Sequence, residues 1–325
     1  MANTSQVAGF GKVPRMGDFV RVRAHAEPTA SFENWIQEAM AYGEAKRGAA
    51  WPAIYQGGAI HAFVFRPPKK SKSASPASVV AGVFRPSLDA VGRRFPLVVA
   101  APLAEQIVAP GPHLLPLVLG DFFEAATQQL MTVDSVGSLE EFERHVSRVA
   151  SPYLDDAAAR NAEYTQWAYN TPLATAWSVV YGDPNSRQPI HAINTISECL
   201  ASFRGKEALD TPLSVRVPLG SGGIAAAAFW LDIVRRIARW NATVPTYFLH
   251  FDGYTGSMLV QLGDTPPSSL LELWAPDPAS DHVCDLMGAA RFDEGRLLAR
   301  LPPPVAQLLQ RGDRPVIELL NVLAQ

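Results

Sequence analysis

The chain has 325 residues, of which 48% are hydrophobic and 18% are charged, and its formal net charge is −3. This composition is that of a globular protein with enough apolar material for a sizeable core. Because lysine and arginine are not in excess, electrostatics gives no support for nucleic-acid binding. The two cysteines, Cys199 and Cys284, make neither a disulfide framework nor a zinc motif, and they predict a reducing compartment.

No segment predicts export or membrane insertion. The N-terminus lacks the apolar run of a signal peptide. The longest run of small apolar residues, Ile224 to Leu231, is far too short to span a bilayer. We therefore expect a cytoplasmic protein.

The first hundred residues predict strands joined by shaped loops, with one helix. Strands are expected at 7–10, 19–20, 61–66, 79–84 and 96–102. A helix is expected to begin after an N-cap at Ser31, since Phe32, Trp35 and Ile36 start an apolar face, and to end before Trp51-Pro52. The polar stretch 67–76 predicts an exposed basic loop.

The middle of the chain predicts helices, and the second half returns to alternating elements. Ser138 and Glu141 form a capping box at the start of one helix. The helices expected in the middle span residues 113–131, 138–149, 157–169, 173–181 and 190–203. Later elements are strands at 214–217, 246–251 and 257–262, a helix at 224–240 and two short helices within 305–323.

This order of elements predicts an α/β fold with a mixed central sheet flanked by helices, in a layered α/β/α arrangement. We expect an N-terminal domain of residues 1–150 and a C-terminal α/β region of residues 151–325. The C-terminal region forms a second α/β subdomain or completes the same sheet, and the sequence leaves both arrangements open.

Two polar loops are the strongest candidates for function. The stretch 9–20 places glycines, a proline, two cations and an aspartate between apolar residues, and such a mixture predicts a shaped loop. The stretch 84–96 joins two buried strands and carries three arginines, whose guanidinium groups suit the capture of carboxylate or phosphate.

Two interpretations of these loops remain open. One is an edge that binds an anion or an acidic peptide; the other is an Asp89–Arg94 or Asp18–Arg93 ion pair that only fixes the loops. The polar residues predicted to line or build the binding region are Lys12, Arg15, Asp18, Ser87, Asp89, Arg93 and Arg94.

A glycine-rich turn offers a rival function. Residues 220–225 match G-x-G-x-x-A between a strand and a helix, and Asp252 ends the next strand, which imitates a dinucleotide-binding unit. However, Asp252 lies farther from the glycines than the roughly 20 residues expected. The simpler interpretation is a turn with no ligand.

Nothing else in the sequence predicts catalysis or a cofactor. None of the histidines is paired with another histidine or a cysteine at metal-ligand spacing, and no nucleophile motif is present. We therefore expect no metal, no cofactor and no enzymatic activity.

The two loops together resemble the motifs of the TagF family, also called ImpM, of bacterial type VI secretion. The first motif stands as Gly11-Lys12-Val13-Pro14-Arg15-Met16-Gly17-Asp18-Phe19, with a spacing before Gly11 one residue tighter than the usual family form. The second stands as Gly82-Val83-Phe84-Arg85-Pro86-Ser87-Leu88-Asp89-Ala90-Val91-Gly92-Arg93-Arg94-Phe95-Pro96-Leu97. The resemblance covers about the first 105 residues.

The resemblance implies a post-translational negative regulator of type VI secretion that is not an enzyme. It implies binding to the forkhead-associated scaffold protein, in a pathway shared with a serine/threonine kinase and its phosphatase. The alternatives are a nucleotide-binding protein or enzyme that uses the 220–225 turn, and a structural accessory of the secretion assembly.

Overall fold

The computed structural model describes residues 6–68, 78–104, 108, 111–152, 154, 156–201, 204–206, 212–240, 243–251, 255–277, 280, 282–288 and 291–325. The strands are β1 (Ala8–Lys12), β2 (Phe19–Val22), β3 (His61–Phe65), β4 (Ser78–Arg85), β5 (Leu97–Ala104), β6 (Ser214–Pro218), β7 (Thr246–Phe251), β8 (Gly256–Gln261) and β9 (Val283–Asp285). In the described residues they form one nine-stranded sheet in the order β2-β1-β5-β4-β3-β7-β8-β6-β9. The β6–β9 pair is parallel, and the other neighbours are antiparallel.

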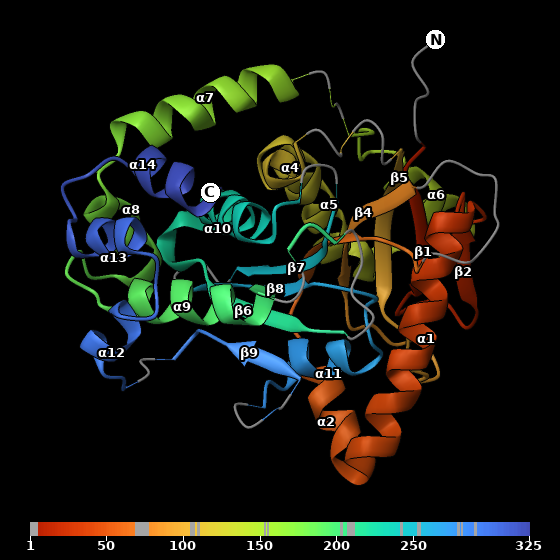
Figure 1. Ribbon diagram of the computed structural model, residues 1–325. Helices are drawn as coiled ribbons and strands as arrows, with labels where there is room; N and C mark the ends of the chain where they lie inside the picture. Colours follow the sequence, from red (N-terminus) through yellow and green to blue (C-terminus); the bar gives the residue numbers. More distant parts are fainter. Residues whose placement is uncertain are drawn as a thin grey trace.

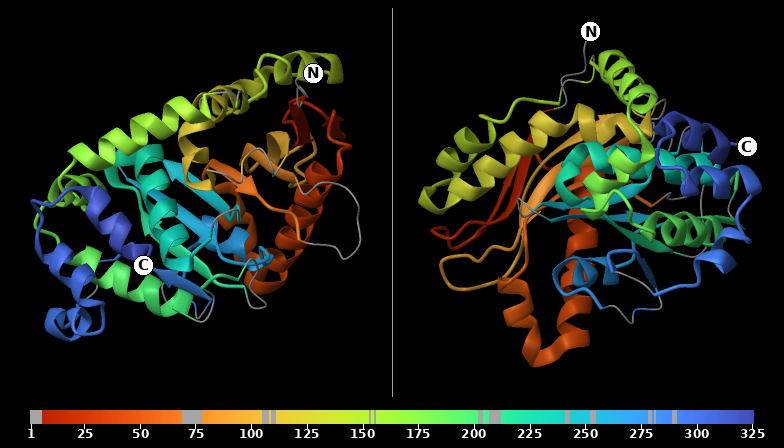
Figure 2. Two further views of the ribbon diagram at one scale, coloured as in Figure 1. Left: turned by 45° about the horizontal axis from the view of Figure 1, so that its top comes forward. Right: turned by 90° about the vertical axis from the view of Figure 1, so that its left-hand side faces the viewer.

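Helices cover both faces of this sheet (Figures 1 and 2). One face carries α1 (Glu27–Arg47), α2 (Trp51–Gln56) and α11 (Ser268–Trp274). The other carries α4 (Leu115–Val118), α5 (Gly120–Thr132), α6 (Leu139–Val146) and α10 (Gly223–Ala238). α9 (Gln188–Leu200) and α14 (Val316–Leu323) contact α10. The remaining helices of this side lie farther out and are α7 (Ala157–Asn170), α8 (Leu173–Tyr181), α12 (Glu294–Leu298) and α13 (Pro303–Gln310). The predicted layered α/β fold is confirmed.

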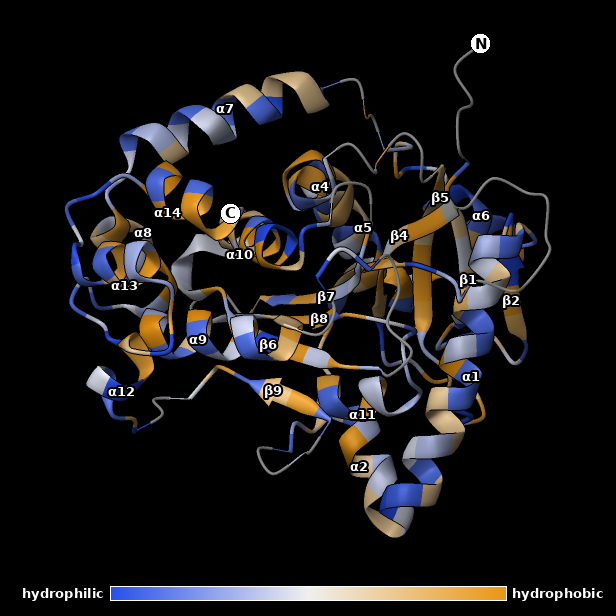
Figure 3. Cartoon of the chain, viewed as in Figure 1, coloured by the Kyte–Doolittle hydropathy of each residue, from blue (hydrophilic) through white to orange (hydrophobic). Residues whose placement is uncertain are grey.

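Strand alternation divides the core into two layers. On the α1 face, aromatic side chains dominate. The centroid of the Phe32 ring lies 4.0 Å from that of the Phe63 ring and 5.5 Å from that of the Trp35 ring. On the opposite face, valines of the central strands pack against α5, and β4 is hydrophobic along its length (Figure 3). Burial on both faces explains why β4 has a continuous apolar sequence instead of an alternating one.

Strands from both halves of the chain belong to the same sheet. β3 pairs with β7, with Phe63 opposite Phe248. One sheet therefore contains strands from both sides of residue 150. The fold also brings the two distant cysteines together, since Cys199 and Cys284 share a hydrogen bond as free thiols. The domain boundary near residue 150 stays a prediction.

Some predicted boundaries are wrong for local reasons. α1 begins at Glu27, with Pro28 in its first turn, where a residue without an N–H is tolerated, so Ser31 lies inside the helix and is not its N-cap. Pro52 likewise sits in the first turn of α2 and starts a helix there. The helix expected over 113–131 is interrupted, because α4 ends at Val118 and α5 begins at Gly120.

Other boundaries agree with the sequence. Ser138 caps α6 by accepting a hydrogen bond from the Glu141 N–H at 3.2 Å, which confirms the N-terminus of this helix. The β7–β8 hairpin and the two C-terminal helices are also confirmed. The sequence patterns missed α11, α12 and β9. Most of the expected 67–76 loop lies outside the described residues. Among the helices that the structure describes, none is long and apolar enough to cross a bilayer.

Candidate functional site: two interlocked loops

The two polar loops are held against each other at one end of the sheet. Residues 12–18 begin at the last residue of β1 and lead to β2, and residues 86–96 join β4 to β5; together we call them the two-loop site. The Ala90 N–H donates to the Met16 carbonyl at 2.9 Å, which joins the two loops by a backbone hydrogen bond. They lie side by side in the right-hand view of Figure 2.

The second loop is a small hairpin built on a tight turn. The Phe95 N–H donates to the Ser87 carbonyl, and the Asp89 N–H donates to the Arg93 carbonyl. The turn closes where the Gly92 N–H donates to the Asp89 carbonyl at 2.9 Å. Gly92 has φ +87°, a conformation that glycine adopts without the steric cost of a Cβ atom. The order Asp-x-x-Gly-Arg in the sequence therefore encodes this turn.

The Asp89 carboxylate is the centre of the site. Its Oδ1 atom accepts hydrogen bonds from the backbone N–H groups of Val91 at 3.1 Å and Arg93 at 2.9 Å. Its Oδ2 atom lies 2.9 Å from Lys12 Nζ and 2.6 Å from Arg93 Nε. One buried carboxylate thus fixes the turn of its own loop and attaches it to β1 of the other loop.

The charge of Asp89 is stabilised by these donors. Burial by itself would raise its pKa, because the charged form loses hydration. The hydrogen bonds from Lys12 and from Arg93 outweigh burial and hold the pKa of the Asp89 carboxyl well below its usual range. Asp89 is therefore ionised at neutral pH, and its side chain is fully buried.

Gly11 sets the position of Lys12. It has φ +130°, and a Cβ atom added to it would lie 2.2 Å from the Pro96 carbonyl oxygen. Only glycine allows β1 to approach the end of the second loop this closely. This approach brings the Lys12 ammonium to Asp89, where the lysine side chain is only 11% exposed.

Two further contacts complete the framework. Arg93 Nη2 donates to the Gly17 carbonyl, so the arginine that pairs with Asp89 also contacts the first loop. The Tyr55 hydroxyl donates to the Ser87 carbonyl at 2.7 Å and accepts from the Ser87 N–H at 2.9 Å. Burial raises the pKa of Tyr55, so this clamp stays protonated. The sequence did not single out Tyr55, whose only signal was its place among apolar residues.

The expected ion pairs are wrong in their partners. Asp89 pairs with Arg93 and Lys12 in place of Arg94, because the hairpin register sets Asp89 opposite Arg93. Asp18 is exposed, and the described residues provide no ion pair for it. In place of its carboxylate, the neighbouring Gly17 carbonyl receives Arg93.

The seven predicted residues fall into a framework and a displayed set. Lys12, Ser87 and Asp89 are buried and hold the loops together. The exposed residues are Arg15, Asp18, Arg93 and Arg94. Between them the apolar tip residue Val91 is 71% exposed. Arg93 belongs to both sets, because its exposed guanidinium group also binds Asp89 and the Gly17 carbonyl. Chemically, the site presents three guanidinium groups and an apolar tip, and the binding role of these residues stays a prediction.

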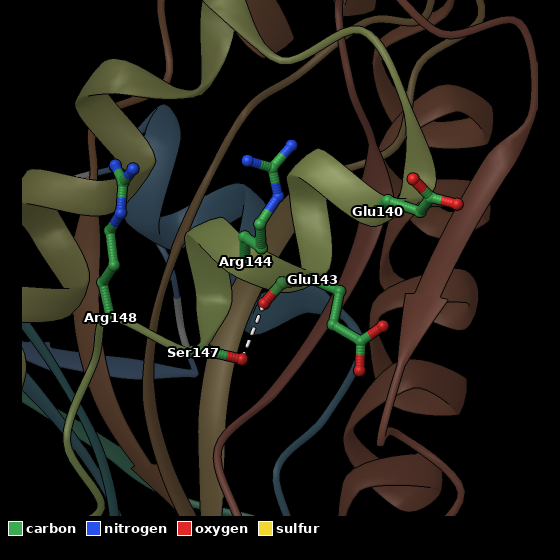
Figure 4. A pocket seen from close by; sticks show the side chains of 5 residues that line it. All are labelled: Glu140, Glu143, Arg144, Ser147 and Arg148. Atoms are coloured by element: carbon green, nitrogen blue, oxygen red, sulfur yellow. Dashed lines mark hydrogen bonds between the residues drawn. The ribbon is translucent and has the colours of Figure 1, made fainter.

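A second polar surface lies on α6. An open hollow of about 510 Å³ is lined by Glu140, Glu143, Arg144, Ser147 and Arg148. In Figure 4 the two arginines point to the same side, whereas both glutamates point elsewhere. The Ser147 hydroxyl donates to the Glu143 carbonyl at 2.8 Å. Two cations and two carboxylates leave the hollow without a net charge that would select a ligand.

The glycine-rich turn has a structural explanation. Gly220 has φ +53°, and a Cβ atom there would lie 2.2 Å from the Val179 carbonyl oxygen, so the glycine allows close packing on α8. β8 lies between β6 and β7 and is antiparallel to both, unlike the adjacent parallel strands of a dinucleotide-binding unit. Asp252 lies outside the described residues. Within the described part of the chain, no group of three or more His, Cys, Asp or Glu side chains is placed to hold a metal ion.

Both loops lie in a region that matches one family model. Residues 8–149 match the family model described as the TagF N-terminal domain, Type VI secretion system-associated. Among solved structures, the crystal structure of PA0076 from Pseudomonas aeruginosa PAO1 is 27% identical, with a TM-score of 0.39. The match covers 46% of this chain and 64% of that chain. No curated protein matches the sequence.

Proposed function

We propose that this chain, whose residues 8–149 match the TagF N-terminal domain of type VI secretion, restrains that secretion from the cytoplasm without acting as an enzyme. In this proposal it binds the forkhead-associated scaffold component of the secretion machinery, in the pathway of the serine/threonine kinase and its phosphatase. The binding surface is the displayed set of the two-loop site.

The observation that carries the proposal is the division of the two loops into a buried framework and an exposed display. A loop that only turned the chain would not need a carboxylate with four donors beneath three guanidinium groups. Arg93 and Arg94 are exposed beside Val91. Arginine is among the residues that most often dominate the binding energy at protein interfaces. Guanidinium groups also favour a partner surface that carries carboxylates or phosphates.

A binding assay with charge-reversed variants tests the surface. Arg94 and Arg15 are exposed and make no ion pair among the described residues, so Arg94→Glu and Arg15→Glu leave the framework intact. We expect each to weaken binding of the purified scaffold protein about tenfold, equivalent to about 1.4 kcal/mol. Arg93→Glu is a poorer test, because it would set a second carboxylate beside Asp89.

The matched control is Arg311→Glu, which reverses a 59% exposed arginine beyond α13, outside the two-loop site. Its binding should equal that of the unaltered protein, with all variants first shown to be folded by circular dichroism. Equal binding by Arg94→Glu, Arg15→Glu and the control would refute the proposed surface.

Secretion in a deletion strain separates a repressor from a structural accessory. Excess secretion of a type VI substrate supports restraint, whereas loss of secretion supports the structural alternative. The nucleotide-binding alternative predicts that a nucleotide raises the melting temperature, since a ligand that binds only the native state stabilises it. We expect no such rise, because the close packing of Gly220 on α8 explains the glycine without a ligand.

A further inference from the structure

A cavity outside the two-loop site joins the two halves of the chain. It has a volume of about 240 Å³ and lies on the sheet face beside α11. His61 comes from β3 in the first half, whereas the other lining residues come from the second half. Among them are Arg216, Phe248, Ser257, Leu259, Glu272 and Asp285.

Strand register explains why polar groups meet on this face. His250 lies opposite Ser257 on the neighbouring strand, and the pairing of Ala62 with Leu249 brings the ring of His61 next to that of His250. Leu259 lies opposite Arg216, which lies opposite Asp285. The short α11 ends at Trp274, so part of the polar sheet face is left to line a cavity.

Two imidazole rings lie side by side on this sheet face, and the ring of His61 lines the cavity. The Nδ1 atom of His61 lies 3.1 Å from the Ala59 carbonyl, and that of His250 lies 3.1 Å from the Ile60 carbonyl. Because a carbonyl only accepts, both Nδ1 atoms carry the hydrogen, and in the neutral rings both Nε2 atoms are acceptors. The ring centroids are 5.3 Å apart.

The Nε2 atom of His61 has no hydrogen-bond partner among the described residues. The residue is only 3% exposed and lines the cavity, and no hydrogen bond to this atom is found among the described residues. Burial, with the neighbouring His250 and Arg216, lowers the pKa of His61 to about 3. The ring is therefore neutral at physiological pH, and the lone pair of Nε2 is available to a ligand.

The charged groups of the cavity sum to a negative value. Arg216 donates from Nη1 to Asp285 at 2.6 Å and from Nη2 to the Glu272 carboxylate at 3.3 Å. One buried guanidinium thus faces two carboxylates, and His61 adds no charge. An anion would meet an arginine that is already neutralised, whereas a cation would complete the charge balance.

We propose that this cavity binds a small organic cation that carries an ammonium or guanidinium group. The cationic N–H groups donate to His61 Nε2 and to the Glu272 carboxylate, and the apolar part of the ligand lies against Phe248 and Leu259. The volume is below the 300 Å³ or so of ordinary small-molecule pockets, so the ligand is of about amino-acid size. This site is independent of the proposed secretion surface.

Isothermal titration of the full chain with agmatine, L-arginine, L-lysine and spermidine tests the inference. At least one of these cations should bind with one-to-one stoichiometry, and phosphate and L-glutamate should not. His61→Gln and Glu272→Gln should each weaken that binding at least tenfold. Ser257→Leu fills the cavity from a half-buried position and should abolish binding, even if a substitution at His61 perturbs the fold.

The control is Glu140→Gln, which removes an exposed carboxylate on α6 and should leave binding unchanged. Absence of binding by all four cations overturns the inference. Binding that survives Ser257→Leu and Glu272→Gln, or binding of the anions in preference to the cations, overturns it as well.

Discussion

At the scale of single residues, Asp89 decides whether the two loops stay joined. Its pKa is depressed in the folded state, so its stabilising effect is complete above the unfolded value of roughly 3.9 and is lost as pH falls through the lower folded value. Asp89→Asn should therefore lower the unfolding free energy at neutral pH, and the difference from the unaltered protein should shrink below about pH 4. Urea unfolding across this pH range measures the difference. Asp18→Asn, at an exposed neighbour, should show no such dependence.

At the scale of elements, the end of β1 depends on one glycine. Gly11→Ala would force a Cβ atom against the Pro96 carbonyl at a φ of +130°, and it should cost about 2 kcal/mol or more of unfolding free energy. Gly17→Ala is the matched control in the same loop, since nothing lies within 4 Å of its Cβ position. Thermal unfolding of both variants measures the contrast. Equal stability of the two would contradict the role of Gly11.

The sequence predicted elements well where a local pattern controls them. The capping box at Ser138 located the start of α6, and the apolar run of β4 located a central strand. It failed where a short element depends on distant packing: β9 has three residues and forms only by pairing with β6. In the two-loop site, the sequence named residues that the fold brings together but paired them with the wrong partners, because the register that sets Asp89 opposite Arg93 is a tertiary property.

At the scale of the whole molecule, the sheet unites strands that are distant in the chain. Whether the late strands join the early ones depends on long-range pairing, such as β3 with β7, which no local pattern encodes. That pairing also sets His61 beside His250 and creates the cavity next to α11. Their spacing along the chain offers no reason to associate these two histidines, because they are neighbours across strands.

Buried histidines should set the acid stability of the whole fold. Burial lowers the pKa of His113 to about 4, against roughly 6.5 in the unfolded chain. Between these values the unfolded state binds a proton that the folded state does not, so stability falls as pH is lowered from about 6.5 to 4. Titration of His113 alone should lower the free energy of unfolding by roughly 3 kcal/mol over that pH range. His61, with its still lower pKa, acts in the same direction.

His113→Phe should flatten this decline. Nδ1 of His113 is buried without a hydrogen-bond partner among the described residues, and its ring packs against that of Tyr164, so phenylalanine keeps the contact and removes the titration. Urea unfolding should show a smaller loss of stability for the variant between pH 6.5 and 4. Measurements near pH 8, where residue 113 is neutral in both states, separate this effect from any change in packing. Parallel pH profiles for the two proteins would show that His113 is not held neutral by the fold.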